Sequence, residues 1–245
     1  MAIVTVRRNT RRHLALLVLV LIMAVPAEAS AYSCSGRCYG STAWNGLVDG
    51  SNVRISVAST YMNDGSRFIN NGMWLLDVGG NTCTISSGHP SSVTWAEVHM
   101  TARQGRYRYM WADCRPGMIY RDVILADVPA ADYGTQPLFE IARTAATTFR
   151  ISIQSGNYSM THYSLSNTMA PDRIRIGQEL NGTTGGHAHD LKWTHNRYTH
   201  GGTAYFQFRP GDGTTIEAPV QAWWHTVPAP GNNGGDWRAR CPCGP

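Results

Sequence analysis

The chain has 245 residues, of which 42% are hydrophobic, 10% are aromatic and only 15% are charged. This composition excludes a disordered, collagen-like or coiled-coil protein and predicts a globular one. Most of the formal charge of +5 comes from residues 1–31, because removing their four Arg and one Glu leaves 17 basic against 15 acidic groups. With a net charge of +2 and no run of Lys or Arg, the remaining chain is not expected to bind nucleic acid.

The first 31 residues have the pattern of an export signal. Four arginines precede an apolar run from Leu14 to Val25, and small residues then fit an A-x-A cleavage site ending at Ala29 or Ala31. Arg11 and Arg12 also fit a twin-arginine signal. The apolar run is short for a membrane span, and no second one follows. We therefore expect residues 1–31 to be a signal peptide, and residues 32–245 to be one secreted domain with no membrane partner.

All six cysteines lie after the predicted cleavage site, and an even number in an exported chain is typical of disulfides. A bridge between the two termini closes the longest loop and so restricts the unfolded chain most. A local bridge near the N-terminus is the main alternative, and a zinc ribbon is another interpretation of the same cysteines. The pairs that we expect are Cys83 with Cys114, and Cys34 and Cys38 with Cys241 and Cys243.

Short segments of alternating polar and apolar residues recur between clusters of Gly, Asn, Pro and Ser, and no longer segment after the signal has helical spacing. This pattern predicts an all-β domain, a two-sheet sandwich or jelly roll with no internal linker or repeat. The expected strands are Asn52–Ser59, Gly72–Val78, Val93–Thr101, Arg106–Ala112, Leu138–Ala142, Thr148–Gln154, Arg173–Leu180, Ala188–Thr194, Thr203–Phe208 and Gln221–Thr226.

Two of the four Glu that follow the signal lie on strand faces turned away from the core. In Val93–Thr101, alternation puts three apolar residues on one face, and Trp95, Glu97 and His99 on the other. A carboxylate between a Trp and an imidazole suits a binding groove better than a solvated surface. The other two Glu, Glu140 and Glu217, have the surroundings of ordinary exposed residues.

Alternation in Arg173–Leu180 turns Glu179 away from the core in the same way. Gly177 lies one step before it on the same face and leaves room for a ligand or another backbone. Two carboxyls that meet on one face cannot both ionise cheaply, so one pKa rises and the pair can hold a shared proton. Glu97 and Glu179 would then form an acid–base pair, unless they are two unrelated surface carboxylates.

Further groove neighbours are expected beside the two carboxylates. Tyr109 belongs to an aromatic stripe, with Tyr107 and Trp111, that either floors a groove or packs the sandwich interior. Gln178 alternates to the opposite face from Glu179, so it reaches the groove only if a β-bulge follows Gly177. Tyr109 and Gln178 are therefore candidate substrate-binding residues, together with Trp95 and His99.

Two groups of short motifs resemble the neprosin-type glutamic peptidases. The first group is Thr94–Glu97 followed by the strand that ends at Asp113, and the second is Ile176–Leu180 followed by Gly185-Gly186-His187. The resemblance implies a bent two-sheet sandwich of the concanavalin A-like lectin/glucanase type. It also implies two catalytic glutamates on the concave sheet, at Glu97 and Glu179, and a preference for proline next to the cut. We expect a monomeric endopeptidase that acts on polypeptides at acid pH without a cofactor.

Other functions remain alternatives to peptide hydrolysis. Four histidines lie between His187 and His200, and His187 and His189 could present two rings as zinc ligands, although no H-E-x-x-H motif is present. A sandwich with paired glutamates could also cleave glycosides. A third possibility is a non-catalytic module that binds polysaccharide or cell wall through aromatic and amide side chains.

Overall fold

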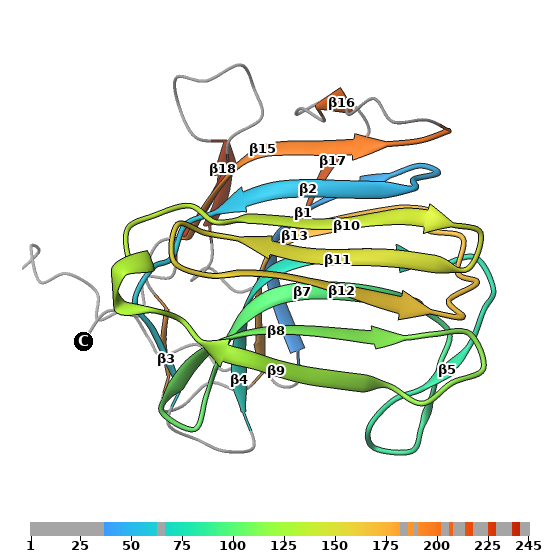
Figure 1. The fold of residues 1–245 in the computed structure, drawn as a ribbon, viewed down its shortest axis with the longest axis horizontal. Coiled ribbons are helices and arrows are strands. Elements are labelled where there is room, and N and C mark those ends of the chain that lie inside the picture. Colours follow the sequence, from blue (N-terminus) through green and yellow to red (C-terminus); the bar gives the residue numbers. More distant parts are fainter. Residues whose placement is uncertain are drawn as a thin grey trace, which may run out of the picture. The chain divides into compact units, whose positions relative to one another are not determined.

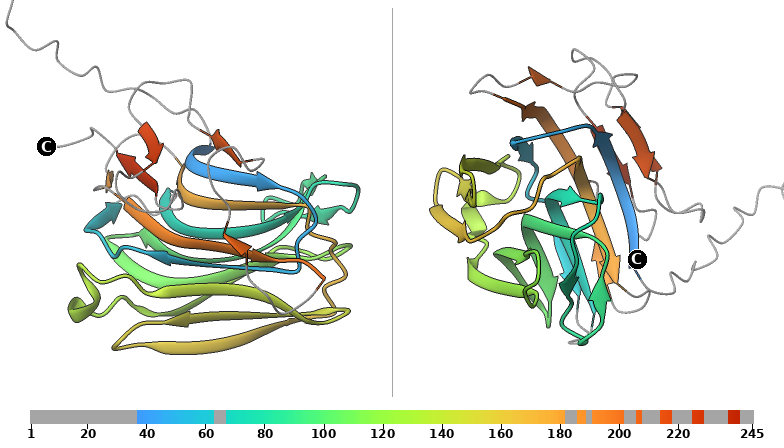
Figure 2. Two further views of the ribbon diagram at one scale, coloured as in Figure 1. Left: turned by 90° about the horizontal axis from the view of Figure 1, so that it is seen from above. Right: turned by 90° about the vertical axis from the view of Figure 1, so that its right-hand side faces the viewer.

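A computed structural model describes residues 37–62, 67–181, 186–188, 191–201, 206–207, 214–217, 225–228 and 237–240. All of them belong to one compact unit, Tyr32–Pro245. The fold is all-β, as the sequence predicts, and its strands form two antiparallel sheets in two layers (Figures 1 and 2). The predicted signal peptide lies outside the described residues. Within the described part of the chain, no helix is long and apolar enough to cross a membrane.

The first layer is a sheet of seven strands. Its central strands come from distant parts of the sequence, since β13 lies between β1 and β4. In spatial order the strands are β17 (Thr214–Glu217), β1 (Arg37–Asn45), β13 (Arg173–Asn181), β4 (Phe68–Asp77), β7 (Thr94–Arg103), β8 (Arg106–Cys114) and β9 (Arg121–Asp127).

The second layer is a sheet of eight strands, in which β16 pairs only with β15. Two short two-stranded sheets and one turn of 3₁₀ helix complete the described elements. The strands of the second layer are β12 (Ser159–Leu165), β11 (Thr148–Gln154), β10 (Leu138–Ala145), β2 (Gly50–Ile55), β15 (Leu191–Thr199), β19 (Trp237–Arg240), β18 (His225–Pro228) and β16 (Phe206–Gln207). The remaining elements are the pair β3 (Thr60–Met62) and β14 (Gly186–Ala188), the pair β5 (Cys83–Thr84) and β6 (Pro90–Ser91), and the helix η1 (Ala130–Asp132).

The hydrophobic core lies between the two sheets. Alternate residues of the central strands point into it, and burying them supplies the main driving force for folding. From the seven-stranded sheet the core takes Met73 and Leu75 of β4, Ala96, Val98 and Met100 of β7, and Ile174 and Ile176 of β13; from the other sheet it takes Phe139, Ile141, Phe149 and Ile151. We call the opposite side of the seven-stranded sheet its outer face.

Sequence alternation predicts the central strands better than the edge strands. The strand Thr148–Gln154 has the predicted bounds, and β4, β7, β8 and β13 each start or end within a few residues of them. In contrast, β1, β9 and β12 are not predicted. β9 and β12 lie at the edges of their sheets, where most of their side chains are at least partly exposed and no clean apolar alternation is needed. β1 lies between β17 and β13, so this explanation does not apply to it.

A buried carboxylate joins the two sheets at this edge. Asp113 near the end of β8 is fully buried and accepts a hydrogen bond from Ser164 Oγ of β12 at 2.5 Å. Its second partner, Arg121 of β9, donates from Nη2 at 2.9 Å. Arg121 also lies over the ring of Trp111, 4.6 Å from its centroid. Charge-assisted hydrogen bonds of this kind compensate for burying the carboxylate.

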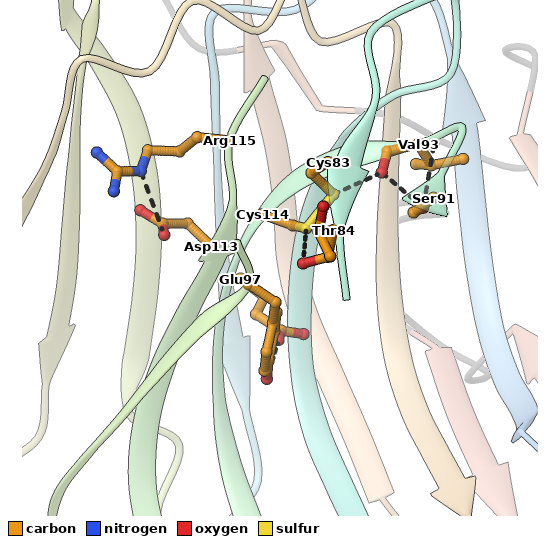
Figure 3. Close-up of a disulfide and its surroundings, with 9 residues drawn as sticks. Cys83, Thr84, Ser91, Val93, Glu97, Asp113, Cys114 and Arg115 are labelled. Atoms are coloured by element: carbon orange, nitrogen blue, oxygen red, sulfur yellow. Dashed lines mark hydrogen bonds and ion pairs between the residues drawn. A yellow bond between two sulfur atoms is a disulfide. The ribbon is translucent and has the colours of Figure 1, made fainter. Parts of the chain in front are cut away.

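The disulfide between Cys83 and Cys114 is present, as predicted, and fastens the β5–β6 pair to the end of β8 (Figure 3). Around it lies a second apolar cluster on the outer face, formed by Trp74, Leu76, Trp95, Cys83 and Cys114, with Tyr120 packed against it. Figure 3 shows Glu97 on the strand beside this disulfide. The expected bridges between the termini involve cysteines whose side chains lie outside the described residues.

Candidate active site

Strand register places both predicted catalytic residues on the outer face of the same sheet. Residues that pair across neighbouring strands share a face, and the pairing defines three adjacent rows across β13, β4 and β7. The Glu179 row contains Glu179, Asn70, Thr101 and Arg108; the glycine row contains Ser41, Gly177, Gly72 and His99; the Glu97 row contains Arg175, Trp74, Glu97 and Ala112. The glycine row therefore runs between the two carboxylates.

Glu97 is 5% exposed and is held by three side chains. Trp74, its register partner on β4, donates from Nε1 to Glu97 Oε2. Tyr120 donates from its hydroxyl to Oε1 at 3.3 Å. His99 Nδ1 lies 3.8 Å from Oε2. An indole and a phenol at the rim of the apolar cluster thus fix the orientation of this carboxylate.

Glu179 is 3% exposed and lies beside an amide. Asn70, its register partner on β4, donates from Nδ2 to Glu179 Oε2 at 3.1 Å. The other amide atom, Asn70 Oδ1, is buried and has no hydrogen-bond partner. A buried acceptor without a donor is costly, so a water or ligand N–H at this position would be favourable.

Two glycines interrupt the layer of side chains between the carboxylates. Gly177 and Gly72 pair directly across β13 and β4. At Gly72 a Cβ would lie 2.6 Å from Val98 O, and at Gly177 it would lie 2.4 Å from Gly40 O. Gly177 also has a φ of +149°, which residues with a side chain rarely adopt. Both positions require glycine because the neighbouring strands approach too closely for any side chain.

His99, the register partner of Gly72 on β7, is completely buried. Neither ring nitrogen has a hydrogen-bond partner. Burial lowers the pKa of His99 to about 4, and the charges of Glu179 and Asp122 offset only part of that effect. The ring is therefore neutral above that pH and offers one N–H donor and one acceptor. Which nitrogen carries the proton would be decided by whatever binds there.

Glu97 and Glu179 lie on opposite sides of the glycine row. Their strands are separated by β4, and the register offsets them by four residues along the sheet. For strands about 4.8 Å apart with a rise of about 3.3 Å per residue, their Cα atoms are about 16 Å apart. The side chains must lean toward one another to act together.

The core face of the same strands carries a hydrogen-bonded polar network, in which one buried amide oxygen, Gln178 Oε1, has no partner. Gln178 donates from Nε2 to Asn71 Oδ1 at 2.7 Å, and Asn71 Nδ2 donates to the hydroxyls of Tyr107 and Thr60 at 2.8 and 3.2 Å. Gln178 therefore lies on the face opposite Glu179, since no bulge follows Gly177 in the continuous β13–β4 register. The structure does not bring Gln178 to the outer face as a substrate-binding residue.

Tyr109 also points into the core. It is fully buried, donates to Asp132 Oδ2 at 2.7 Å and stacks on Tyr158 with ring centroids 4.9 Å apart. The aromatic stripe of β8 thus packs the sandwich interior, which was one of its two expected roles, and Tyr109 does not line the outer face. The reason is that the stripe alternates in step with the core residues of β7.

The other predicted neighbours of Glu97 lie on its face. Trp95 belongs to the apolar cluster around the disulfide and packs on Tyr120 with ring centroids 5.7 Å apart. His99 is the register partner of Gly72 and lies between the two carboxylates. The two histidines suggested as zinc ligands cannot be placed, because the side chain of His187 and all of His189 lie outside the described residues. Among the residues that are described, no three His, Cys, Asp or Glu side chains gather to hold a metal ion.

Three residues of the site are missing from the sequence-based prediction: Asn70, Trp74 and Tyr120. For Trp74 a signal exists, because alternation within Gly72–Val78 places it on the same face as Gly72. Asn70 precedes the predicted start of that strand. Tyr120 follows the turn after β8 and reaches Glu97 through tertiary packing, for which local sequence gives no signal.

Comparison with known proteins gives a fold relationship only. No protein-family model and no curated protein matches the chain. Solved structures do match it over 86% of this chain and 100% of theirs, at 10% sequence identity. One is scytalido-glutamic peptidase with a transition state analog inhibitor (TM-score 0.56), and another is SCP-B, a member of the eqolisin family of peptidases, in a complex with the tripeptide Ala-Ile-His (TM-score 0.57). The chain therefore shares its fold with these two peptidases. In this fold, both glutamates proposed from sequence lie buried on one face of one sheet.

Proposed function

We propose that the protein is a secreted glutamic-type endopeptidase, and that Glu97 and Glu179 are its catalytic residues. One observation carries this proposal: two carboxylates from distant parts of the sequence are buried on one sheet face, on either side of a row that holds two paired glycines and an imidazole without a hydrogen-bond partner. Perturbed or unsatisfied polar groups that cluster in this way are typical of functional sites. The glutamic-peptidase fold and the motifs that resemble neprosin-type peptidases support the same conclusion.

In the proposed reaction a peptide group lies over Gly177 and Gly72. Glu179, oriented by Asn70, acts as general base and takes a proton from a water as its oxygen attacks the carbonyl carbon. Glu97, in its protonated form, donates a hydrogen bond to the oxyanion that develops on the carbonyl oxygen. The C–N bond then breaks, and the leaving nitrogen takes a proton from one of the two carboxyls. Because one carboxyl must be protonated and the other ionised, activity should be highest at acid pH.

His99 and Asn70 are suited to hold the substrate. A neutral His99 can donate one hydrogen bond and accept another, and Asn70 Oδ1 can accept from a peptide N–H. Together they would form hydrogen bonds with the peptide group that lies over Gly177 and Gly72. The resemblance to neprosin-type peptidases also implies cleavage next to proline, which matched peptides with Pro or Ala beside the cut would test.

The test is digestion of a denatured protein mixture by purified residues 32–245 between pH 3 and 7. Variants Glu97→Gln and Glu179→Gln should each lower the rate roughly 100-fold or more, because each removes one acid–base group while keeping its shape. The matched control is Glu140→Gln on β10, in the other sheet, where the carboxylate pairs with Arg150. This control should keep wild-type activity.

Other outcomes point to the alternative functions. If no peptide is cleaved but the protein is retained on insoluble polysaccharide, the site is a carbohydrate-binding one. If oligosaccharides are cleaved and both Glu variants lose that activity, the pair acts on glycosides, and the stereochemistry of the product then reports the carboxyl separation. Loss of peptide cleavage with a chelator would move the chemistry to a metal.

A further inference from the structure

The Glu179 row ends in an arginine for which the described residues supply no ion pair. Arg108 on β8 is 9% exposed. Its Nη2 donates to the main-chain oxygen of Arg103 at 3.5 Å, and its Nε has no hydrogen-bond partner. A guanidinium is always charged and carries five N–H donors, so burying it with one long hydrogen bond is unfavourable. A bound anion would relieve that cost.

The acidic residue nearest in register does not neutralise Arg108. Asp127 on β9 pairs with Arg108 across the sheet but forms its ion pair with Arg106, at 2.5 Å. That carboxylate is half exposed, whereas Arg108 is buried. Arg103 lies opposite Arg106 across the β7–β8 turn, so arginine side chains gather at this end of the sheet, where Asp127 pairs with Arg106.

The row connects this arginine to the proposed catalytic base. Glu179, Asn70, Thr101 and Arg108 lie on four neighbouring strands in register and point to the same face. All four are buried. Three strand spacings separate the Cα atoms of Glu179 and Arg108, about 14 Å. An extended peptide advances about 3.3 to 3.6 Å per residue, so about four residues would cover that distance.

We propose that Arg108 binds a carboxylate of the peptide substrate, within about four residues of the bond that is cut. This inference rests on the proposed peptidase function and adds a substrate class to it. The planar guanidinium matches a carboxylate with two parallel hydrogen bonds, a geometry that Lys does not reproduce. The carboxylate comes either from an acidic side chain or from the free C-terminus of the peptide, and both present the same group to Arg108.

The first experiment compares matched peptides in cleavage assays. One series places Asp or Glu at each of four positions on either side of a common cleavage site, with Asn or Gln twins and an amidated C-terminus. A second series has neutral side chains and ends in a free carboxylate or an amide. Wild type should cleave one acidic peptide, or the free-acid peptide, roughly 10- to 100-fold better in kcat/KM than its neutral twin. Equal values for every twin pair would overturn the proposal.

Variants of Arg108 then test whether this residue causes the preference for the peptide that carries the carboxylate. Arg108→Met should abolish the preference, so that the acidic peptide and its neutral twin are cleaved with equal kcat/KM. Arg108→Lys should retain part of the preference, and it keeps the proposal testable if Arg108→Met does not fold. The matched control is Arg106→Met, which removes an equal charge from the exposed neighbour and should leave the preference intact. A preference that survives in both Arg108 variants, or that Arg106→Met removes, would contradict the assignment.

Binding measurements separate this proposal from the proposed function. Glu179→Gln should bind the labelled acidic peptide more tightly than its neutral twin, and Arg108→Met in that background should bind both equally. If no peptide is ever cleaved but this binding difference is found, the carboxylate site stands and the peptidase function fails. If peptides are cleaved but bind and react without regard to charge, the peptidase function stands and the carboxylate site fails.

Discussion

Two neighbouring asparagines on β4 show how the two faces of one sheet differ. Asn71 points into the core, where its oxygen accepts from Gln178 and its nitrogen donates to Tyr107 and Thr60. Asn70 points to the outer face, where its nitrogen meets Glu179 and its buried oxygen meets no donor. Consecutive asparagines thus differ: the side-chain oxygen of Asn71 accepts a hydrogen bond, and that of Asn70 does not. The oxygen of Asn70 lies on the face that carries the two carboxylates, so it is the one that a ligand N–H would meet there.

The largest expected effect concerns the disulfide, which lies at the closed, apolar end of the outer face. Replacing Cys83 and Cys114 together with Ala should lower the free energy of unfolding by about 4 kcal/mol, because a bridge across a sequence separation of 31 residues restricts the unfolded chain. Urea unfolding of the variant beside wild type measures the loss. A change below about 1 kcal/mol would show that the outer-face cluster is stable without the bridge.

The next largest effect is a pH dependence of stability caused by His99, the buried imidazole of the outer face. In the unfolded chain a His has a pKa near 6.5, whereas that of His99 in the fold is about 4. As the pH falls, the unfolded state therefore binds the proton before the folded state does. The free energy of unfolding is unaffected by His99 above pH 6.5 and decreases as the pH falls from there toward 4. The full decline is about 3 kcal/mol.

Unfolding free energies measured across that pH range test this prediction. His99→Gln should remove this part of the pH dependence, because Gln does not titrate. The control His89→Gln, at an exposed position, should leave the dependence as in wild type. An unchanged slope in His99→Gln would mean that other groups produce it.

A smaller effect on stability is expected at Gly72, where the backbones of β4 and β7 approach closely. Gly72→Ala should lower the free energy of unfolding by about 2 kcal/mol, since a Cβ there would overlap atoms of β7 that cannot move freely. Gly156→Ala is the matched control, because its Cβ would meet nothing within 4 Å. Thermal unfolding of both variants gives the comparison, and equal stabilities would contradict the close approach of β4 and β7.

The smallest effect sharpens the comparison of the asparagines directly. Asn71→Ala leaves Gln178 and Tyr107 without their buried partner, so it should cost about 1 to 2 kcal/mol more stability than Asn70→Ala. Asn70→Ala should instead lower peptide cleavage more than Asn71→Ala does at a temperature where both are folded. Denaturation curves and activity assays on the two variants measure both quantities. The reverse pattern would show that the outer-face amide is structural.

Sequence alone predicts the face of a residue on a central strand but not what that residue meets. Alternation correctly separates Glu97 and His99 from Val98 because β7 has neighbours on both sides and one fully apolar face. It cannot supply the offset between Glu97 and Glu179, because that depends on how β13 and β7 each pair with β4. The unpartnered atoms of His99 and Arg108 are likewise invisible in the sequence, since they reflect groups that tertiary packing leaves without partners.

The buried Asp113 has a consequence for how the molecule opens. Its hydrogen bonds with Ser164 and Arg121 join β8 and β9 of one layer to β12 of the other. These strands cannot separate at this edge without exposing a carboxylate that has lost its donors. Amide hydrogens of the three strands should therefore exchange with deuterium at similar free energies, as one cooperative unit of opening. The same hydrogen bonds should make β9 and β12, the edge strands of the two sheets, resist fraying together.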